Sequence, residues 1–189
     1  EDIELPFLPI AEEMKRRGIK INVQFLRDLS KKLHVDLDKI EKEIWKKAGA
    51  EFNINSPKQL GEILFEKMQI KIKGLRKTPT GAYSTKESEL IKMQGTNKIV
   101  NDILKYRELQ KLLSTYIDNI PDMVSSDGRL HANFIQTGTT TGRLSSNDPN
   151  LQNIPTKTEL GNEIRKAFIV EKGFKLLSFD YSQIELRIV

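Results

Sequence analysis

The chain has 189 residues, enough for one medium domain or two small ones, and its hydrophobic content of 38% permits a buried core. There are 31 Lys and Arg against 26 Asp and Glu, and the resulting net charge of +5 favours a polyanionic partner without proving one. The absence of cysteine excludes disulfides and cysteine nucleophiles, and because no apolar run reaches membrane length we expect a soluble, cytoplasmic protein.

The N-terminal quarter is predicted to form two helices joined by an extended segment. Apolar residues at helical spacing indicate a helix over 3–17 that Gly18 caps, and alternation then indicates an extended segment over 19–23. Apolar residues at steps of three, four and seven predict a long amphipathic helix over 22–47. We interpret His34 as a surface residue of that helix rather than a metal ligand, since two histidines without cysteine argue against a zinc site.

Capping signals predict two further helix starts in the middle of the chain. Ser56 precedes Pro57 and Gln59, a capping box with proline at the first helical position. Free N–H groups at such a start can bind one phosphate, although a well-capped helix is the simpler interpretation. Ser84 and Glu87 form a second capping box.

A basic segment surrounds the second of these starts. Residues 71–82 are polar, basic and interrupted by glycine and proline, which predicts a loop. Apolar residues from 99 to 117 then predict a second long helix that ends near Pro121. Between positions 71 and 111, ten Lys or Arg stand against four Asp or Glu. A charge run is usually a solvated face, but here it coincides with a loop and helix starts, the groups that hold a sugar-phosphate backbone.

Strand signals replace helical ones after residue 125. Residues 130–136 have strand character, and the polar stretch 137–155 is predicted to be a long functional loop. A hairpin is predicted from 165–170 and 174–180, on either side of a Glu-Lys-Gly turn.

Asp180 falls where the last predicted strand passes into a C-terminal helix. Ser182 and Glu185 form a capping box ahead of the apolar residues in 184–189. A carboxylate at this junction suits a hard cation such as Mg²⁺, or else it merely helps to cap the helix. Because the apolar helix shows no C-cap, we expect a continuation or a second chain to complete it.

Two runs of sequence resemble family A DNA polymerases, the DNA polymerase I family. DYSQIELR, at 180–187, resembles their motif A, and TTTGRLSSNDPNLQNIP, at 139–155, matches a second family motif upstream of it. Weaker similarity extends through ELPFLPIAEEMKRRGIKIN, NINSPKQLGEILFEKM, TPTGAYSTKESEL and ILKYRELQKLLSTYID, so it covers nearly the whole chain.

The resemblance implies an α+β class: an incomplete polymerase fold with long antiparallel thumb helices and the start of an antiparallel palm sheet. It implies three parts along the chain. These are a palm-packing lead-in segment at 1–21, a helical thumb subdomain at 22–122, and the first part of the palm with motif A at 123–189.

The resemblance also implies roles around Asp180. In such a polymerase two metal ions activate the primer 3′-hydroxyl and stabilise the leaving pyrophosphate. Asp180 would be one of two aspartates that bridge two Mg²⁺ ions, with the backbone carbonyl of Tyr181 as a further ligand. Glu185 would lie against C2′ of the incoming nucleotide and exclude a ribose hydroxyl, a role compatible with capping. The other residues implied at the nucleotide are Ser182, Gln183 and Ile184.

Duplex contacts follow from the same resemblance. Arg143 would enter the minor groove at the primer-terminal pair, where every correct pair shows an acceptor, so that one donor checks geometry without reading sequence. Arg143 therefore joins Asp180 and Glu185 in the implied catalytic set. The remaining implied DNA contacts are Asn55, Ser56, Lys58, Lys77, Tyr83, Ser84, Thr85, Lys86, Arg107, Lys111, Thr140, Asn150, Gln152, Asn153 and Lys157. Lys157 stands where the family commonly has arginine, which keeps the charge but loses bidentate phosphate binding.

These features predict the thumb and initial palm of a DNA-directed DNA polymerase that adds deoxynucleotides to a primer 3′ end. Its expected partners are primer–template duplex, deoxynucleoside triphosphates and the remaining polymerase portion (fingers and rest of the palm), with no membrane. Without that portion we expect the chain to be inactive. The alternative is a non-catalytic duplex-DNA-binding module derived from a thumb. An RNA-directed or phage-type single-subunit polymerase shares the metal chemistry, but Glu185 and the TGRLSS run count against an RNA polymerase.

Overall fold

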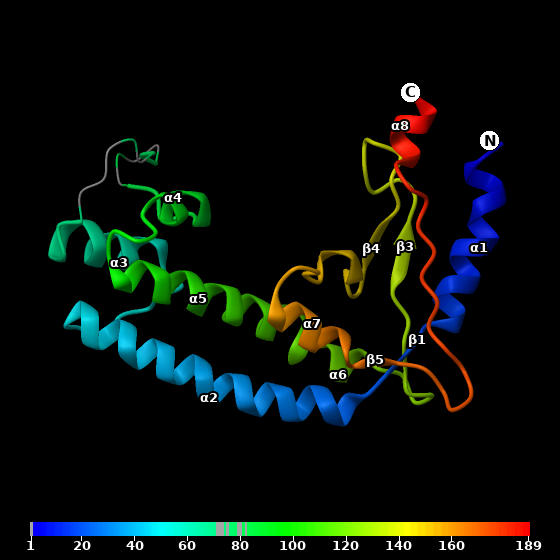
Figure 1. The fold of residues 1–189 in the computed structure, drawn as a ribbon, viewed down its shortest axis with the longest axis horizontal. Coiled ribbons are helices and arrows are strands. Elements are labelled where there is room, and N and C mark those ends of the chain that lie inside the picture. Colours follow the sequence, from blue (N-terminus) through cyan, green and yellow to red (C-terminus); the bar gives the residue numbers. More distant parts are fainter. Residues whose placement is uncertain (1, 71–73, 75, 79–80, 82) are drawn as a thin grey trace. The chain divides into compact units, whose positions relative to one another are not determined.

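The computed structural model describes residues 2–70, 74, 76–78, 81 and 83–189 (Figure 1). Helices combine with two small antiparallel sheets, so the predicted α+β class is confirmed. The chain forms two compact units. The first unit is Glu1–Leu26 with Ile120–Val189, and the second is Arg27–Asn119. Within the described chain, every helix falls short of the length and apolar character that a membrane span requires.

The first unit holds the strands and several short helices. Its helices are α1 (Glu4–Arg17), the first turn of α2 (Val23–Ala48), α6 (Ile120–Met123), the 3-10 helix η3 (Leu151–Asn153), α7 (Glu159–Arg165) and α8 (Ile184–Ile188). Its strands are β1 (Ile19–Ile21), β2 (Arg129–Leu130), β3 (Asn133–Ile135), β4 (Ser145–Asn147) and β5 (Phe168–Ile169).

Gly18 ends α1 and directs the chain into β1, as its position in the sequence predicts. Its φ of 57° lies in the left-handed region, and its N–H donates to the carbonyl of Met14. A Cβ at this position would stand 2.6 Å from the carbonyl oxygen of Leu130, so only glycine fits between α1 and β2. The start of α1 lies beside β3, where Gln136 donates a side-chain hydrogen bond to the carbonyl of Glu4 at 3.0 Å.

β1 is the central strand of a three-stranded antiparallel sheet with the order β2-β1-β5. Ile19 pairs with Leu130, and Lys20 pairs with Ile169. β3 and β4 form a separate two-stranded sheet. The single strand predicted over 130–136 is therefore wrong, because the chain leaves one sheet and enters another at His131. The His131 ring nitrogens lie 2.8 Å from the carbonyl oxygen of Lys15 and 3.3 Å from Oδ2 of Asp127.

Two predictions for the C-terminal third are corrected. The stretch 137–155 is not one loop, since it contains β4 and η3. The predicted hairpin is also absent from the described structure: β5 pairs with β1, and residues 174–180 have no regular secondary structure. A strand needs a hydrogen-bonding neighbour, and in the described structure the apolar side chains of this segment are exposed, as Phe179 is by 90%. The C-terminal helix α8 begins at Ile184, two residues after the predicted cap Ser182.

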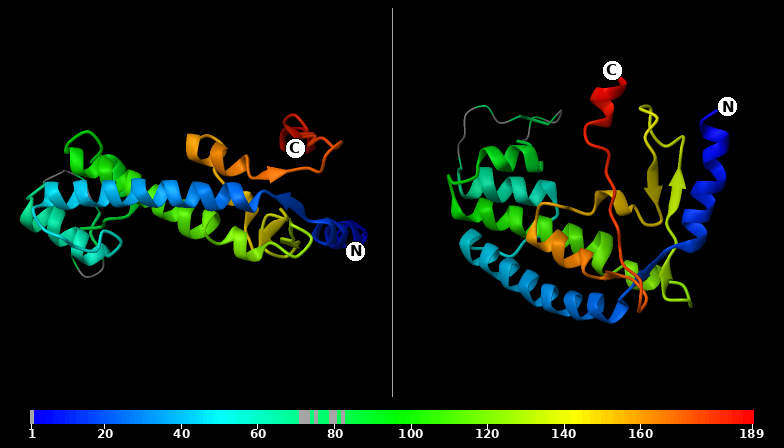
Figure 2. Two further views of the ribbon diagram at one scale, coloured as in Figure 1. Left: turned by 90° about the horizontal axis from the view of Figure 1, so that it is seen from below. Right: turned by 45° about the vertical axis from the view of Figure 1, so that its right-hand side comes forward.

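The second unit is helical. It contains the rest of α2, then α3 (Pro57–Gly61), the π-helix η1 (Glu62–Lys67), α4 (Glu87–Lys92), α5 (Lys98–Leu112) and the π-helix η2 (Leu113–Ile117). Figure 2 shows α2 and α5 running antiparallel side by side. Contacts fix this direction, because Lys47 pairs with Asp102 at one end while Ser30 donates to Asp118 at the other, at 2.7 Å. The two long helices predicted from periodicity are confirmed.

The core of the second unit lies between these helices and the shorter ones. Fully buried side chains include Ile44 from α2, Leu64 from η1, Leu90 from α4 and Ile103 from α5. Each such side chain contributes about 1.5–3 kcal/mol by leaving water. His34 is half-exposed and lies 3.1 Å from Asp118, which agrees with its interpretation as a surface residue.

The two capping boxes of this unit differ from prediction in part. Ser56 caps α3 by accepting from the N–H of Gln59, as expected, but the Gln59 side chain accepts from the N–H of Asn53. The prediction that Ser84 and Glu87 form a capping box is wrong. Lys86 is the N-cap of α4 and makes no side-chain capping bond, and Ser84 instead accepts from the N–H of Lys86. Of the loop predicted over 71–82, residues 71–73, 75, 79–80 and 82 lie outside the described residues.

Candidate nucleic-acid interface

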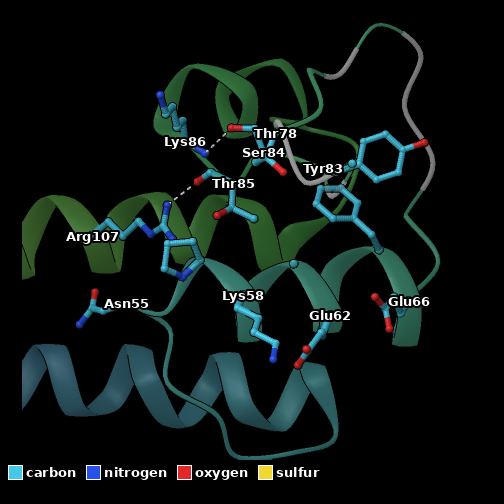
Figure 3. Close-up of a pocket in the computed structure, with 14 residues that line it drawn as sticks. Asn55, Lys58, Glu62, Glu66, Thr78, Tyr83, Ser84, Thr85, Lys86 and Arg107 are labelled. Atoms are coloured by element: carbon cyan, nitrogen blue, oxygen red, sulfur yellow. Dashed lines mark hydrogen bonds between the residues drawn. The ribbon is translucent and has the colours of Figure 1, made fainter.

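A cavity of about 990 Å³ opens on the second unit, between α3, η1, the segment before α4, and α5 (Figure 3). It brings together a large share of the predicted DNA contacts. These are Asn55, Lys58, Tyr83, Ser84, Thr85, Lys86 and Arg107. Ser56 stands beside it as the cap of α3. Lys111 is exposed on α5 and does not line it.

Three lysines on this face make no ion pair within the part of the chain that the structure describes. Lys58, Lys77 and Lys86 are exposed, and no described carboxylate forms an ion pair with any of them. Elsewhere in the same unit, by contrast, Lys47 and Lys92 are paired with Asp102 and Glu89. An exposed ammonium without a partner keeps its charge available to an anion. The face therefore suits a polyanion at positions where the sequence predicted phosphate contacts.

Tyr83 adds an aromatic surface to the cavity. Its ring centroid lies 4.9 Å from that of Phe65 with an interplanar angle of 48°, and the Lys77 ammonium stands 5.2 Å from the Tyr83 centroid. Tyr83 is 42% exposed and lines the cavity, so its ring is accessible to whatever enters. Phe65 was missed by sequence reasoning.

Glu62, Glu66 and Thr78 also line the cavity and were also missed. The spacing carried part of the signal, because Glu62, Phe65 and Glu66 follow Lys58 by four, seven and eight residues, the spacing of one helical face. The two carboxylates therefore place negative charge on the same wall of the cavity as Lys58.

Arg107 connects elements as well as lining the cavity. Its Nη1 donates to the carbonyl of Thr85 at 2.5 Å and its Nη2 to the carbonyl of Ile54 at 3.4 Å. The guanidinium is half-buried, and this burial lowers its pKa, while the charge of Glu87 acts in the opposite direction. Arg107 thus holds the segments before α3 and α4 against α5, and its contact with DNA stays a prediction.

In the first unit, the loop between β3 and β4 presents Thr140 and Arg143, both exposed. Thr139 donates through Oγ1 to the Arg143 carbonyl at 2.7 Å, which closes the loop. Gln152 donates through Nε2 to the carbonyl of Leu144 at 2.9 Å, so η3 is held against this hairpin. The cap of η3 is Asn150, whose Oδ1 accepts from the N–H of Gln152 at 3.1 Å.

Asn153 and Lys157 are exposed nearby in the sequence. Because Gln152 bonds to the Leu144 carbonyl, the β3–β4 hairpin and η3 together form one local platform that carries Thr140, Arg143, Asn150 and Gln152. Their roles at a duplex stay predictions.

The predicted metal and nucleotide residues lie on the exposed C-terminal segment. Asp180 and Tyr181 are exposed, Ser182 and Gln183 form a turn, and Ile184 begins α8. Arg187 donates through Nε to the carbonyl of Ser182 at 3.0 Å, which fixes the turn against the helix. The Glu185 side chain lies outside the described part of the structure.

Asp180 and the Tyr181 carbonyl offer the oxygen donors that Mg²⁺ prefers. In the part of the chain that the structure describes, no group of three or more His, Asp or Glu residues gathers at one point. The donors are therefore right in kind but too few for a metal centre built from the described residues alone.

The structure thus combines a helical unit, whose cavity is lined by lysines and an aromatic ring, with a mixed unit that exposes Asp180. Residues 23–189 match the family model described as DNA polymerase family A, and the chain belongs to this family.

Similar proteins agree with this assignment. The chain is 46% identical over 190 residues to a thermostable DNA polymerase I of Thermus filiformis and 47% identical over 190 residues to DNA polymerase I of a Synechocystis species. These alignments cover 100% of the chain but only 23% and 19% of the two relatives, so the chain spans about a fifth of their length. Among solved structures, the chain resembles the POL domain of Pol1 from M. smegmatis in complex with DNA primer-template and dNTP. That match has a TM-score of 0.86 and 36% identity, and it covers 98% of this chain and 32% of the other.

Proposed function

We propose that this chain is the duplex-holding part, and one portion of the catalytic part, of a template-directed DNA polymerase that adds deoxynucleotides to a primer 3′ end. The observation that carries the proposal is the cavity of the second unit, which is lined by the exposed Lys58 and Lys86 and by the Tyr83 ring, with the Lys77 ammonium over that ring. Among the described residues, no carboxylate forms an ion pair with these three lysines. Phosphate contacts from such cations hold a duplex independently of its sequence. The similar M. smegmatis structure, a complex with DNA primer-template and dNTP, supports this assignment.

Residues 22–122 act as the thumb in this proposal, 1–21 as the lead-in that packs on the palm, and 123–189 as the first part of the palm. Arg143 inserts a donor into the minor groove at the primer terminus, and Gln152 and Asn153 stand beside it. This contact checks the geometry of the last base pair, because a mispair moves the minor-groove acceptors.

In this proposal, Asp180 and the Tyr181 carbonyl would hold part of a Mg²⁺ pair. When bound, such ions activate the primer hydroxyl and stabilise the leaving pyrophosphate. Ser182, Gln183 and Ile184 line the triphosphate, and Glu185 excludes a ribose hydroxyl at C2′. One carboxylate cannot neutralise two divalent ions that repel each other at close range, so further carboxylates must come from the remaining polymerase portion.

The same reasoning makes the isolated chain inactive. The exposed apolar residues Leu186 and Ile188 of α8 give that remaining portion a surface to pack on. We also propose the cytoplasm as the compartment, since a bacterial-type polymerase needs duplex DNA and deoxynucleoside triphosphates together.

Primer extension with Mg²⁺ tests this function, using the purified chain with and without the missing polymerase portion supplied as a second chain. We expect duplex binding by the chain alone and extension only by the pair. Asp180→Ala should remove extension and leave duplex binding unchanged, whereas the control Asp122→Ala, at another exposed aspartate of the first unit, should change neither. Robust extension by the chain alone, lost in Asp180→Ala, would show that the site is complete without a partner.

A further inference from the structure

Glu89 is the one charged side chain that the described structure buries, with 3% of the residue exposed. It lies in α4, a helix whose first turn also carries the exposed Glu87. A buried carboxylate is costly unless it is paired and hydrogen-bonded, so its partners indicate what it is for.

The carboxylate has two kinds of partner. The Lys92 ammonium lies 2.8 Å from Oε1 and 2.9 Å from Oε2, and the backbone N–H of Arg76 donates to Oε2 at 3.1 Å. The bond from Lys92 and then that from Arg76 hold the pKa of Glu89 below its ordinary value. Lys92 is a neighbour on the same helix. Arg76, thirteen residues before Glu89, belongs to the other side of the loop that precedes α4.

The bond to Arg76 joins the carboxylate to the stem of that loop. The Arg76 carbonyl accepts from the N–H of Ser84 at 2.9 Å, and the next pair, Lys77 and Tyr83, forms an antiparallel bridge. Lys77 places its ammonium over the Tyr83 ring, which lines the cavity. An unbroken series of contacts thus leads from the buried carboxylate to the exposed ammonium of Lys77.

We propose that Glu89 is a positioning residue for duplex binding: its carboxylate holds the Arg76 main chain against α4, so that Lys77 and Tyr83 are ordered at the edge of the cavity. The proposal rests on the function proposed above, in which this face holds the sugar-phosphate backbone. Glu89 itself touches no DNA. It acts through the loop stem, and an acidic residue thereby strengthens the binding of a polyanion.

The direction in which one substitution changes duplex affinity distinguishes this positioning role from a simple effect of charge. Removing a negative charge beside a polyanion site should strengthen binding or leave it unchanged, and we expect this of the control Glu87→Ala. Glu89→Ala also removes one negative charge from this helical turn, yet it should weaken binding and lower the salt slope of log Kd by about 0.9, because one phosphate contact is lost. We expect the same loss from Lys77→Gln.

A double variant tests the path of the effect. Once Lys77→Gln is present, adding Glu89→Ala should cause almost no further loss, since both changes remove one contact. The assay is fluorescence anisotropy of a labelled primer–template duplex across a salt series. Equal shifts from Glu87→Ala and Glu89→Ala, or additive losses in the double variant, would overturn the proposal.

The wild-type chain supplies a measurement that does not depend on how well a variant folds. In an NMR titration, the Arg76 amide proton should shift together with the Glu89 carboxyl, at pH values below the 4.5 that is ordinary for a glutamate. If the chemical shift of the Arg76 amide proton does not change during this titration, the contact is absent. If the wild type binds no duplex, the proposed function fails and this role fails with it. If it binds while Glu89→Ala behaves like Glu87→Ala, this role alone fails.

Discussion

The two lysines that line the cavity provide a quantitative test of duplex holding. Lys58 stands in α3 and Lys86 caps α4, and both are exposed and lie on the cavity wall. We predict that the double variant Lys58→Gln/Lys86→Gln binds every duplex sequence more weakly by the same factor. A phosphate contact carries no sequence information, so its loss cannot favour one sequence over another.

The magnitude follows from the number of contacts removed. Each phosphate contact contributes about 0.9 to the slope of log affinity against log salt concentration, so two lost contacts lower the slope by about 1.8. Between about 50 and 200 mM salt, the affinity of the wild type should therefore fall about 12-fold more than that of the variant. The assay is fluorescence anisotropy with two labelled duplexes of unrelated sequence.

The control variant is Lys31→Gln/Lys39→Gln, which also removes two positive charges from the second unit. These lysines lie on α2, outside the cavity, and pair with Asp28 and Asp36 at 4.0 and 3.4 Å. We expect its slope to stay close to that of the wild type. If the control lowers the slope as much as the cavity variant does, net charge rather than the cavity holds the duplex. An unchanged slope in the cavity variant would also refute the reasoning.

Two further predictions concern single residues. In the complete polymerase, Glu185→Ala should raise CTP insertion relative to dCTP far more than it lowers duplex affinity, and an unchanged ratio of the two insertion rates would exclude the steric role. Burial, followed by the charge of Glu41, raises the pKa of Tyr106 above its ordinary 10.0, so its contribution to stability is complete below pH 10 and is lost as the pH rises through the folded-state pKa. Above pH 10, the free energy of unfolding measured by chemical denaturation should therefore depend less on pH in Tyr106→Phe than in the wild type. Equal pH dependence in the two proteins would contradict this.

Local sequence signals were enough for the longer helices. Apolar spacing predicted α1, α2 and α5, and Gly18 and Ser56 predicted a helix end and a helix start correctly, because a helix and its caps depend on residues within a few positions of each other. The family was also evident from sequence, since two long motifs in a fixed order are carried by the residues themselves.

Only the tertiary structure decided how the strands pair and which side chains become buried. β1 pairs with β2 and β5, more than a hundred residues further along the chain, and no local pattern at Ile19 indicates that its partner is Leu130. The sequence likewise predicted Glu87 as the capping carboxylate and gave no sign of Glu89, whose role depends on Arg76 returning to α4 across a loop. A carboxylate shows its charge in the sequence, whereas its burial and its partners are set by contacts between segments that the chain brings together only on folding.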